Sequence, residues 1–185
     1  MKKIKLIALA LAVCTLGMAL ASCAASGSIE GFAKKMGKKQ SYSAKISITD
    51  EYGERETFEF QYDGNIQYDV ENEYYRVEYD EGVYGLYEKT KDKKWVRTVY
   101  EDDVVDLGDA EDLWDPDNYE KVKGEKNTYK QKKNVIFDNF DDVEMTIDKD
   151  SCTIAGTITL DGETYGFKMI ISDIGEIELE LPELD

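Results

Sequence analysis

The three cysteines are the first residues to consider, because a thiolate is a nucleophile that can accept an acyl or alkyl group. Cys14 lies inside an apolar run at 6–21, and Cys152 alternates with isoleucines in a strand-like segment, which predicts a buried and inert thiol. Cys23 follows the small residues Ala21 and Ser22 at the end of the apolar run. Cys23 is therefore the position where the sequence indicates covalent chemistry, and no disulfide is expected.

The N-terminal segment predicts export. Lys2, Lys3 and Lys5 precede the apolar run, which at roughly 1.5 Å per residue is too short to cross a bilayer comfortably. Leu20-Ala21-Ser22-Cys23 resembles a lipobox, the bacterial signal in which the cysteine thiol receives a diacylglyceryl group and the leader is then removed. The alternative is an ordinary signal peptide that leaves Cys23 as a plain thiol.

This interpretation divides the chain into a signal peptide at 1–22, a tether at 23–27 and a single domain at 28–185. Two or more acyl chains on Cys23 would anchor the domain durably. We therefore expect an exported protein that is held by lipid at the outer face of the bacterial cell membrane, or at the outer membrane where the host has one. The membrane, through lipidated Cys23, is the first expected partner.

The charge and composition exclude several classes of function. The chain has 23 basic and 40 acidic residues, a formal charge of −17, and without the three leader lysines the balance is 20 − 40 = −20. Such a domain repels phosphate backbones, so nucleic acid is not an expected partner. The absence of histidine removes His-based zinc sites and Ser-His or Cys-His pairs. With no nucleotide-binding motif either, we expect no cofactor, no catalytic residue and no enzyme.

Carboxylates leave two alternatives open. Paired Asp or Glu residues can hydrolyse glycosides, which makes a glycan hydrolase a weaker alternative. A dense acidic segment could also hold Ca²⁺, but it lacks EF-hand spacing, so we expect a solvated loop and no metal site. This segment contains Glu101, Asp102, Asp103, Asp106, Asp109, Glu111 and Asp112.

Periodicity predicts one helix followed by many strands. Ile29, Phe32, Ala33 and Met36 fall at i, i+3, i+4 and i+7, which predicts an amphipathic helix at 28–39 that packs on the sheet or on the membrane. A second, short helix is expected near 109–114. After 42 the period changes to two, which is typical of half-buried strands. The expected strands form an antiparallel meander at 42–49, 58–62, 66–70, 75–79, 83–88, 95–100, 128–131, 143–147, 152–160, 163–172 and 176–181.

The order of these segments resembles the small bacterial lipoproteins of the LolA/LppX-like group. The resemblance rests on the lipobox, the helix, and the segments "SYSAKISI", "YDGNIQYDV", "KKWVRT", "LWDPDNYEKV" and "SDIGEIELELP". It implies a mainly β (α+β) fold, in which a strongly curved antiparallel sheet or half-open barrel carries the N-terminal amphipathic helix and the short second helix on its concave side. Members of the group include carriers that hold lipid or lipoprotein acyl chains.

Aromatic side chains supply a candidate lining for an apolar ligand. If the tyrosines of successive strands shared the concave side, they would wall a cavity under the helix. The expected function is thus a non-enzymatic, membrane-anchored protein that binds a lipid or other apolar small molecule. Two alternatives remain: the rings fill an ordinary core, or the chain is an acidic cell-envelope adhesion or scaffold module without a cavity. The candidate lining residues are Ile29, Phe32, Met36, Phe60, Tyr68, Tyr75 and Tyr79.

Overall fold

The computed structural model describes residues 28–39, 41–80, 83–101, 116–133, 140–160 and 162–184. Cys23, the leader expected at 1–22, the acidic residues at 102–112 and the second helix expected near 109–114 lie outside the described residues.

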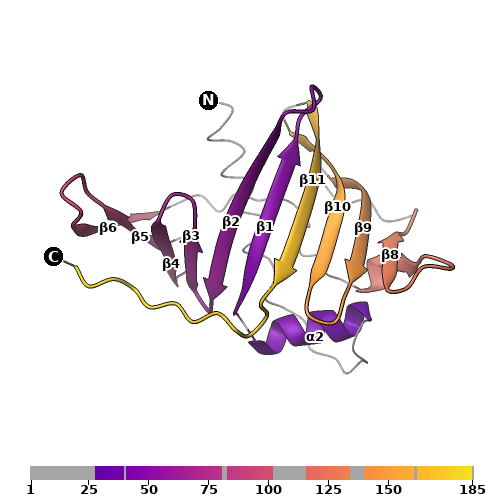
Figure 1. Ribbon diagram of the computed structural model, residues 1–185, viewed down its shortest axis with the longest axis horizontal. Helices are drawn as coiled ribbons and strands as arrows, with labels where there is room; N and C mark the ends of the chain where they lie inside the picture. Colours follow the sequence, from indigo (N-terminus) through magenta and orange to yellow (C-terminus); the bar gives the residue numbers. More distant parts are fainter. Residues whose placement is uncertain are drawn as a thin grey trace.

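The described chain forms one open, antiparallel, eleven-stranded sheet in the order β6-β5-β4-β3-β2-β1-β11-β10-β9-β8-β7 (Figure 1). The expectation of a mainly β fold is confirmed. β1 lies at the centre and pairs with β2 on one side and β11 on the other, so the two halves of the chain extend outward to the edges β6 and β7. The strands are β1 Ser41–Thr49, β2 Arg55–Asp63, β3 Ile66–Asp69, β4 Tyr74–Asp80, β5 Val83–Lys89, β6 Trp95–Glu101, β7 Tyr119–Lys121, β8 Thr128–Gln131, β9 Phe140–Ile147, β10 Cys152–Leu160 and β11 Glu163–Ser172.

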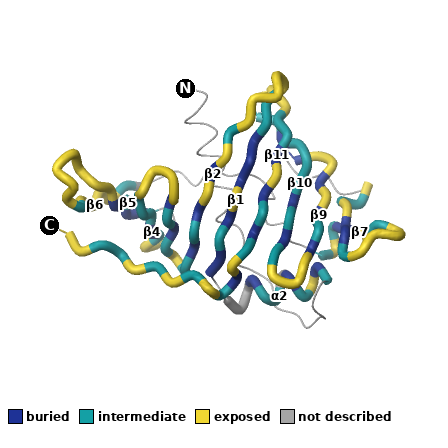
Figure 2. Tube along the Cα trace, viewed as in Figure 1, coloured by how far each residue is buried: buried dark blue, intermediate teal, exposed yellow. Residues whose placement is uncertain are grey.

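One face of the central strands is apolar, and we call it the inner face. Ala44 of β1 pairs with Phe60 of β2 and Ile171 of β11, and Ile46 pairs with Phe58 and Met169. Because side chains alternate across a strand, paired residues share a face, and this register stacks apolar side chains in rows. Figure 2 shows the buried positions concentrated in these central strands.

The opposite, outer face of the same strands is polar. Lys45 Nζ lies 3.4 Å from Glu59 Oε2 across β1 and β2. Arg55 Nη2 donates to Ser47 Oγ at 2.7 Å, and the Ser47 and Thr57 hydroxyls are 3.2 Å apart. The contrast between the two faces is what fixes the strand register, because a slip of one residue would expose every apolar side chain.

A helix, α2 (Ile29–Lys39), packs on the inner face and lies across the ends of the central strands (Figure 1). Ser28 Oγ caps it by accepting a hydrogen bond from Gly31 N at 3.1 Å. Ile29, Phe32 and Met36 are buried within the same apolar cluster as the sheet. The short 3₁₀ helix η2 (Pro116–Asn118), which leads directly into β7, contacts α2.

Three local features differ from the sequence prediction. The segment at 176–181 is extended but forms no strand; it is held by Gly175 N donating to Ser41 O at 2.7 Å and Leu179 N donating to Asp63 Oδ2 at 3.1 Å. β1 and β2, which these two bonds reach, are already paired on both sides, so the segment cannot join the sheet as a further strand beside them. Its alternating pattern therefore does not indicate a strand. The strand predicted at 66–70 ends at Asp69, and Val70 is exposed in the turn that follows. β7, with three residues, was not predicted because it is too short to show an alternating pattern.

Candidate functional site

The register divides the predicted lining residues between the two faces of the sheet. Phe60 on the inner face pairs with Asp69, whereas Tyr68 pairs with Gln61 and therefore lies on the outer face. Tyr75 pairs with Tyr68 and lies there too. The turn after Asp63 has two residues, so even-numbered positions of β2 pair with odd-numbered positions of β3. Tyr68, at an even-numbered position, therefore lies on the face opposite Phe60. The idea that these tyrosines share one side with Phe60 is therefore wrong.

Tyr68, Tyr75, Tyr79, Tyr87 and Trp95 instead form what we call the outer aromatic cluster. The ring centroids of Tyr68 and Tyr75 are 4.6 Å apart, and those of Tyr75 and Trp95 are 5.6 Å apart. Tyr79 Oη lies 2.8 Å from Tyr87 Oη, so Tyr79 is on the same face. Burial, and after it the hydrogen bond with Tyr87, raises the pKa of Tyr79. These rings pack against one another and do not line the inner face.

Tyr79 depends on a glycine beneath it. A Cβ at Gly85 would lie 2.7 Å from the Tyr79 ring, so any larger residue there would push the ring away from β5. Tyr79 remains 45% exposed. The cluster thus lies at the surface, where its ring contacts join β3, β4, β5 and β6.

The other four candidates do come together on the inner face. Ile29, Phe32 and Met36 of α2 and Phe60 of β2 belong to one buried cluster. Met145 and Met169 lie in the same cluster. Methionine side chains are flexible and adapt to irregular shapes, so an inner face with three of them can repack around another apolar group. This is the part of the predicted lining that the structure brings together.

Beside this apolar region lies a row of polar residues that sequence reasoning missed. Tyr62, Gln67 and Arg76 pair in register across β2, β3 and β4, and we call them the inner polar row. Tyr62 stacks on Tyr42 at 4.7 Å, and the Arg76 guanidinium lies 3.8 Å from the Tyr84 ring centroid. In the sequence Gln67 stands between Ile66 and Tyr68 with nothing to distinguish it, and its face could be assigned only once the register was known.

Gln67 is the unusual member of this row. It is only 4% exposed, yet its Nε2 has no hydrogen-bond partner. A buried donor without a partner costs about 1–3 kcal/mol, so native proteins seldom leave one without a reason. The amide group is therefore available to a bound acceptor.

Asp69 lies two residues after Gln67, on the same face of β3, and its carboxylate has hydrogen-bond partners nearby in the chain. Its carboxylate accepts hydrogen bonds from Asn72 N at 2.8 Å and Asn72 Nδ2 at 3.1 Å. It also accepts from Tyr74, whose pKa is raised first by burial and then by the Asp69 charge. Asp69 thus stabilises the β3–β4 turn and is not a free anionic group.

The remaining chemical groups of the described residues offer little for catalysis. Burial raises the pKa of the Cys152 thiol, which keeps it protonated and unreactive. No group of three His, Cys, Asp or Glu side chains within the described ranges is arranged to hold a metal ion. None of the described helices is long and apolar enough to cross a membrane.

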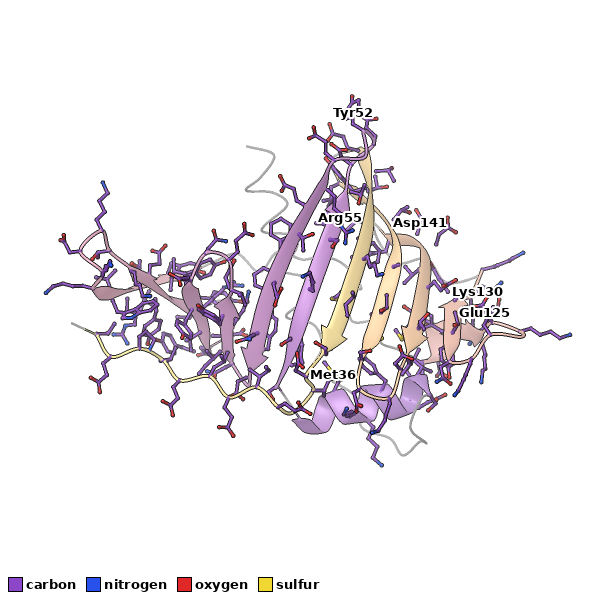
Figure 3. The ribbon with its side chains drawn as sticks, viewed as in Figure 1. Met36, Tyr52, Arg55, Glu125, Lys130 and Asp141 are labelled. Carbon is purple, nitrogen blue, oxygen red and sulfur yellow. The ribbon has the colours of Figure 1, made fainter. Side chains whose placement is uncertain are left out.

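The described residues also line surface hollows, one of which borders the inner face through Ile48 and Tyr165. One, of about 470 Å³, lies where the β1–β2 and β10–β11 turns meet, near Tyr52 (Figure 3). Another, of about 490 Å³, lies between β8 and β9 near Lys130 and Asp141. Neither is lined by any of the predicted lining residues, so they do not correspond to the predicted ligand site.

No model of a known protein family and no curated protein matches this sequence. Its function is therefore argued from the residues and their geometry.

Proposed function

We propose that this protein is an exported, non-enzymatic lipoprotein, anchored through Cys23, that binds an amphipathic ligand with an acyl chain on the inner face of its sheet. The observation that carries the proposal is a continuous, buried apolar face on an open sheet, against which packs a short helix that begins a few residues after Cys23. In the terms of the LolA/LppX-like resemblance, the inner face would be the concave side of a half-open barrel.

α2 is well suited to give way to a ligand. It has 11 residues, a length at which isolated helices are marginal, and Gly31 and Gly37 each weaken it by about 1 kcal/mol relative to alanine. Its ion pair between Lys35 and Asp150, at 3.5 Å, is exposed and contributes about 0–1 kcal/mol. Three apolar side chains therefore supply most of its attachment, and an acyl chain could replace them.

The inner polar row supplies a place for the polar end of that ligand. Gln67 Nε2 offers a buried donor, and Arg76 lies next to it in register with a permanently charged guanidinium. An acceptor such as a carboxylate, phosphate or ester carbonyl oxygen would satisfy the amide. We therefore propose a ligand with an acyl chain on the apolar cluster and an oxygen-rich head at Gln67.

The test is the substitution Gln67→Met, which keeps the length of the side chain but removes the unsatisfied donor. We expect the ligand-free protein to gain about 1–3 kcal/mol in free energy of unfolding, because no buried donor is left without a partner. We also expect a fluorescent fatty acid to bind about tenfold more weakly, a loss of about 1.4 kcal/mol. Urea unfolding and a titration of delipidated protein measure the two effects.

Tyr68→Phe, on the outer face of the same strand, is the matched control and should leave affinity for the fatty acid unchanged. A Gln67→Met protein that is less stable than wild type and binds the fatty acid equally well would show that the inner polar row serves the fold alone.

A further inference from the structure

The basic residues of this acidic chain are unevenly distributed. Residues 121–133 contain six lysines and one acid, Glu125, although the whole chain has a formal charge of −17. This segment forms the β7–β8 hairpin and the residues just after it. Its lysines are Lys121, Lys123, Lys126, Lys130, Lys132 and Lys133.

Most of these lysines face solvent. Lys121, Lys123, Lys126 and Lys133 are exposed, with Lys123 and Lys126 at the tip of the hairpin. Lys130 Nζ forms an ion pair with Glu120 Oε1 at 3.5 Å on one face of the hairpin. Figure 3 shows Lys130 and Glu125 at one extremity of the molecule. Lysines therefore dominate the tip of the hairpin, whereas Asp141, Asp142 and Glu144 of β9 line the hollow beside Lys130, Lys132 and Lys133.

The start of α2 belongs to the same end of the domain. η2 leads into β7 and contacts α2, while Lys35 of α2 pairs with Asp150 in the β9–β10 turn. Lys34 and Lys35 thus lie at the same end as the lysines of the hairpin, with Lys35 in an ion pair. We call this surface, formed by Lys34, Lys35 and the lysines of 121–133, the basic end.

The proposed anchor places the basic end close to a membrane. Ser28, which caps α2, is five residues after Cys23, so the intervening chain can span at most about 18 Å. A domain of charge −20 held at that distance is repelled by anionic headgroups wherever its acidic surface faces them, within a Debye length of about 8 Å. Only an orientation with lysines toward the bilayer turns this repulsion into attraction.

We propose that the basic end docks on anionic phospholipid headgroups and so sets the orientation of the anchored domain. This inference rests on the lipid anchoring proposed above, but it does not depend on the ligand. In this orientation the start of α2, the helix that covers the inner face, lies beside the membrane.

The opposite end of the sheet provides a matched control. The β5–β6 hairpin also carries lysines at its turn, with Lys91, Lys93 and Lys94 exposed, yet it lies at the other extremity from β8 (Figure 1). Reversing three charges at either hairpin changes the net charge equally. The two variants therefore separate a local docking surface from a general effect of charge.

The experiment uses the mature chain, 23–185, with Cys23→Ser, so that no acyl group contributes to binding. Vesicles of phosphatidylglycerol mixed with phosphatidylcholine are compared with vesicles of phosphatidylcholine alone in a sedimentation assay. We expect salt-sensitive binding to the anionic vesicles only. Lys121→Glu, Lys123→Glu and Lys126→Glu together should weaken that binding by at least about 100-fold. Lys91→Glu, Lys93→Glu and Lys94→Glu together should weaken it by less than about tenfold.

Three results would overturn the docking proposal: no binding of the unchanged chain to anionic vesicles, equal losses in the two triple variants, or equal binding to neutral vesicles. Binding to a soluble polyanionic glycan such as dextran sulfate but not to the vesicles would assign the basic end to a glycan and also overturn it. Fatty acid binding measured on the same samples is independent of these outcomes, so a failure of docking is distinguishable from a failure of the proposed ligand site.

Discussion

Cys23→Ser is expected to move the protein from the membrane fraction to the soluble exported fraction. The serine hydroxyl cannot replace the thiol as acceptor of the diacylglyceryl group, so the proposed anchor of two or more acyl chains would be lost. Cell fractionation followed by a wash at high salt measures the effect. The salt wash matters because it removes the electrostatic attachment through the basic end and leaves an acylated protein in place.

Cys14→Ser is the control, because Cys14 lies in the proposed leader but outside the proposed lipobox. It should leave the protein at the membrane. A Cys23→Ser protein that stays with the membrane after the salt wash, at the wild-type level, would remove lipidation from the account.

Phe60→Ala is expected to lower the free energy of unfolding by about 3–5 kcal/mol, the range for truncating a buried phenylalanine. Phe60 is 0% exposed and lies in register between Ala44 of β1 and Asp69 of β3, at the centre of the inner face. The neighbouring strands are paired on both sides, so the space left by the ring cannot close easily. Urea unfolding with an unchanged m-value measures the loss.

Tyr52→Ala is the aromatic control for this experiment. Tyr52 is 79% exposed at the β1–β2 turn, so its loss should change the free energy of unfolding by less than about 0.5 kcal/mol. If Phe60→Ala cost no more than Tyr52→Ala, the inner face at Phe60 would not be the packed surface described above.

Local sequence patterns were sufficient to predict the central strands. The alternation of Ala44, Ile46 and Ile48 and the Asp63-Gly64 turn predicted β1, β2 and their hairpin partners, because the apolar residues of a half-buried strand recur with period two. The burial of Ile29, Phe32 and Met36 follows from helical spacing in the same way. Each of these signals is carried by residues close together in the chain.

Features that depend on pairing between strands could not be predicted. The number of residues in the β2–β3 turn decides whether Tyr68 joins Phe60 or opposes it, and the sequence alone does not fix that number. The irregularity in β10 is similar: a Cβ at Gly156 would lie 2.8 Å from Asp141 O of β9, a contact visible only in the folded sheet. Such features arise from residues far apart in sequence.

The candidate site was predictable only in part for the same reason. The apolar half of the site, on α2 and β2, followed from periodicity, whereas the inner polar row required the register of β2, β3 and β4. Gln67 has no distinguishing sequence context, and only its burial and its unpartnered amide mark it. Tyr68, Tyr75 and Tyr79 were predicted as lining but lie in the outer aromatic cluster, on the opposite face of the sheet.

The central claim is that the inner face holds an amphipathic ligand, and native mass spectrometry tests it most directly. The Cys23→Ser chain is exported from a bacterial host, purified without detergent and measured before and after delipidation. We predict one non-covalently bound acyl lipid per chain before delipidation, and rebinding of a fluorescent fatty acid afterwards. A mass equal to the polypeptide alone in every preparation, together with no binding of the fatty acid, would contradict the account.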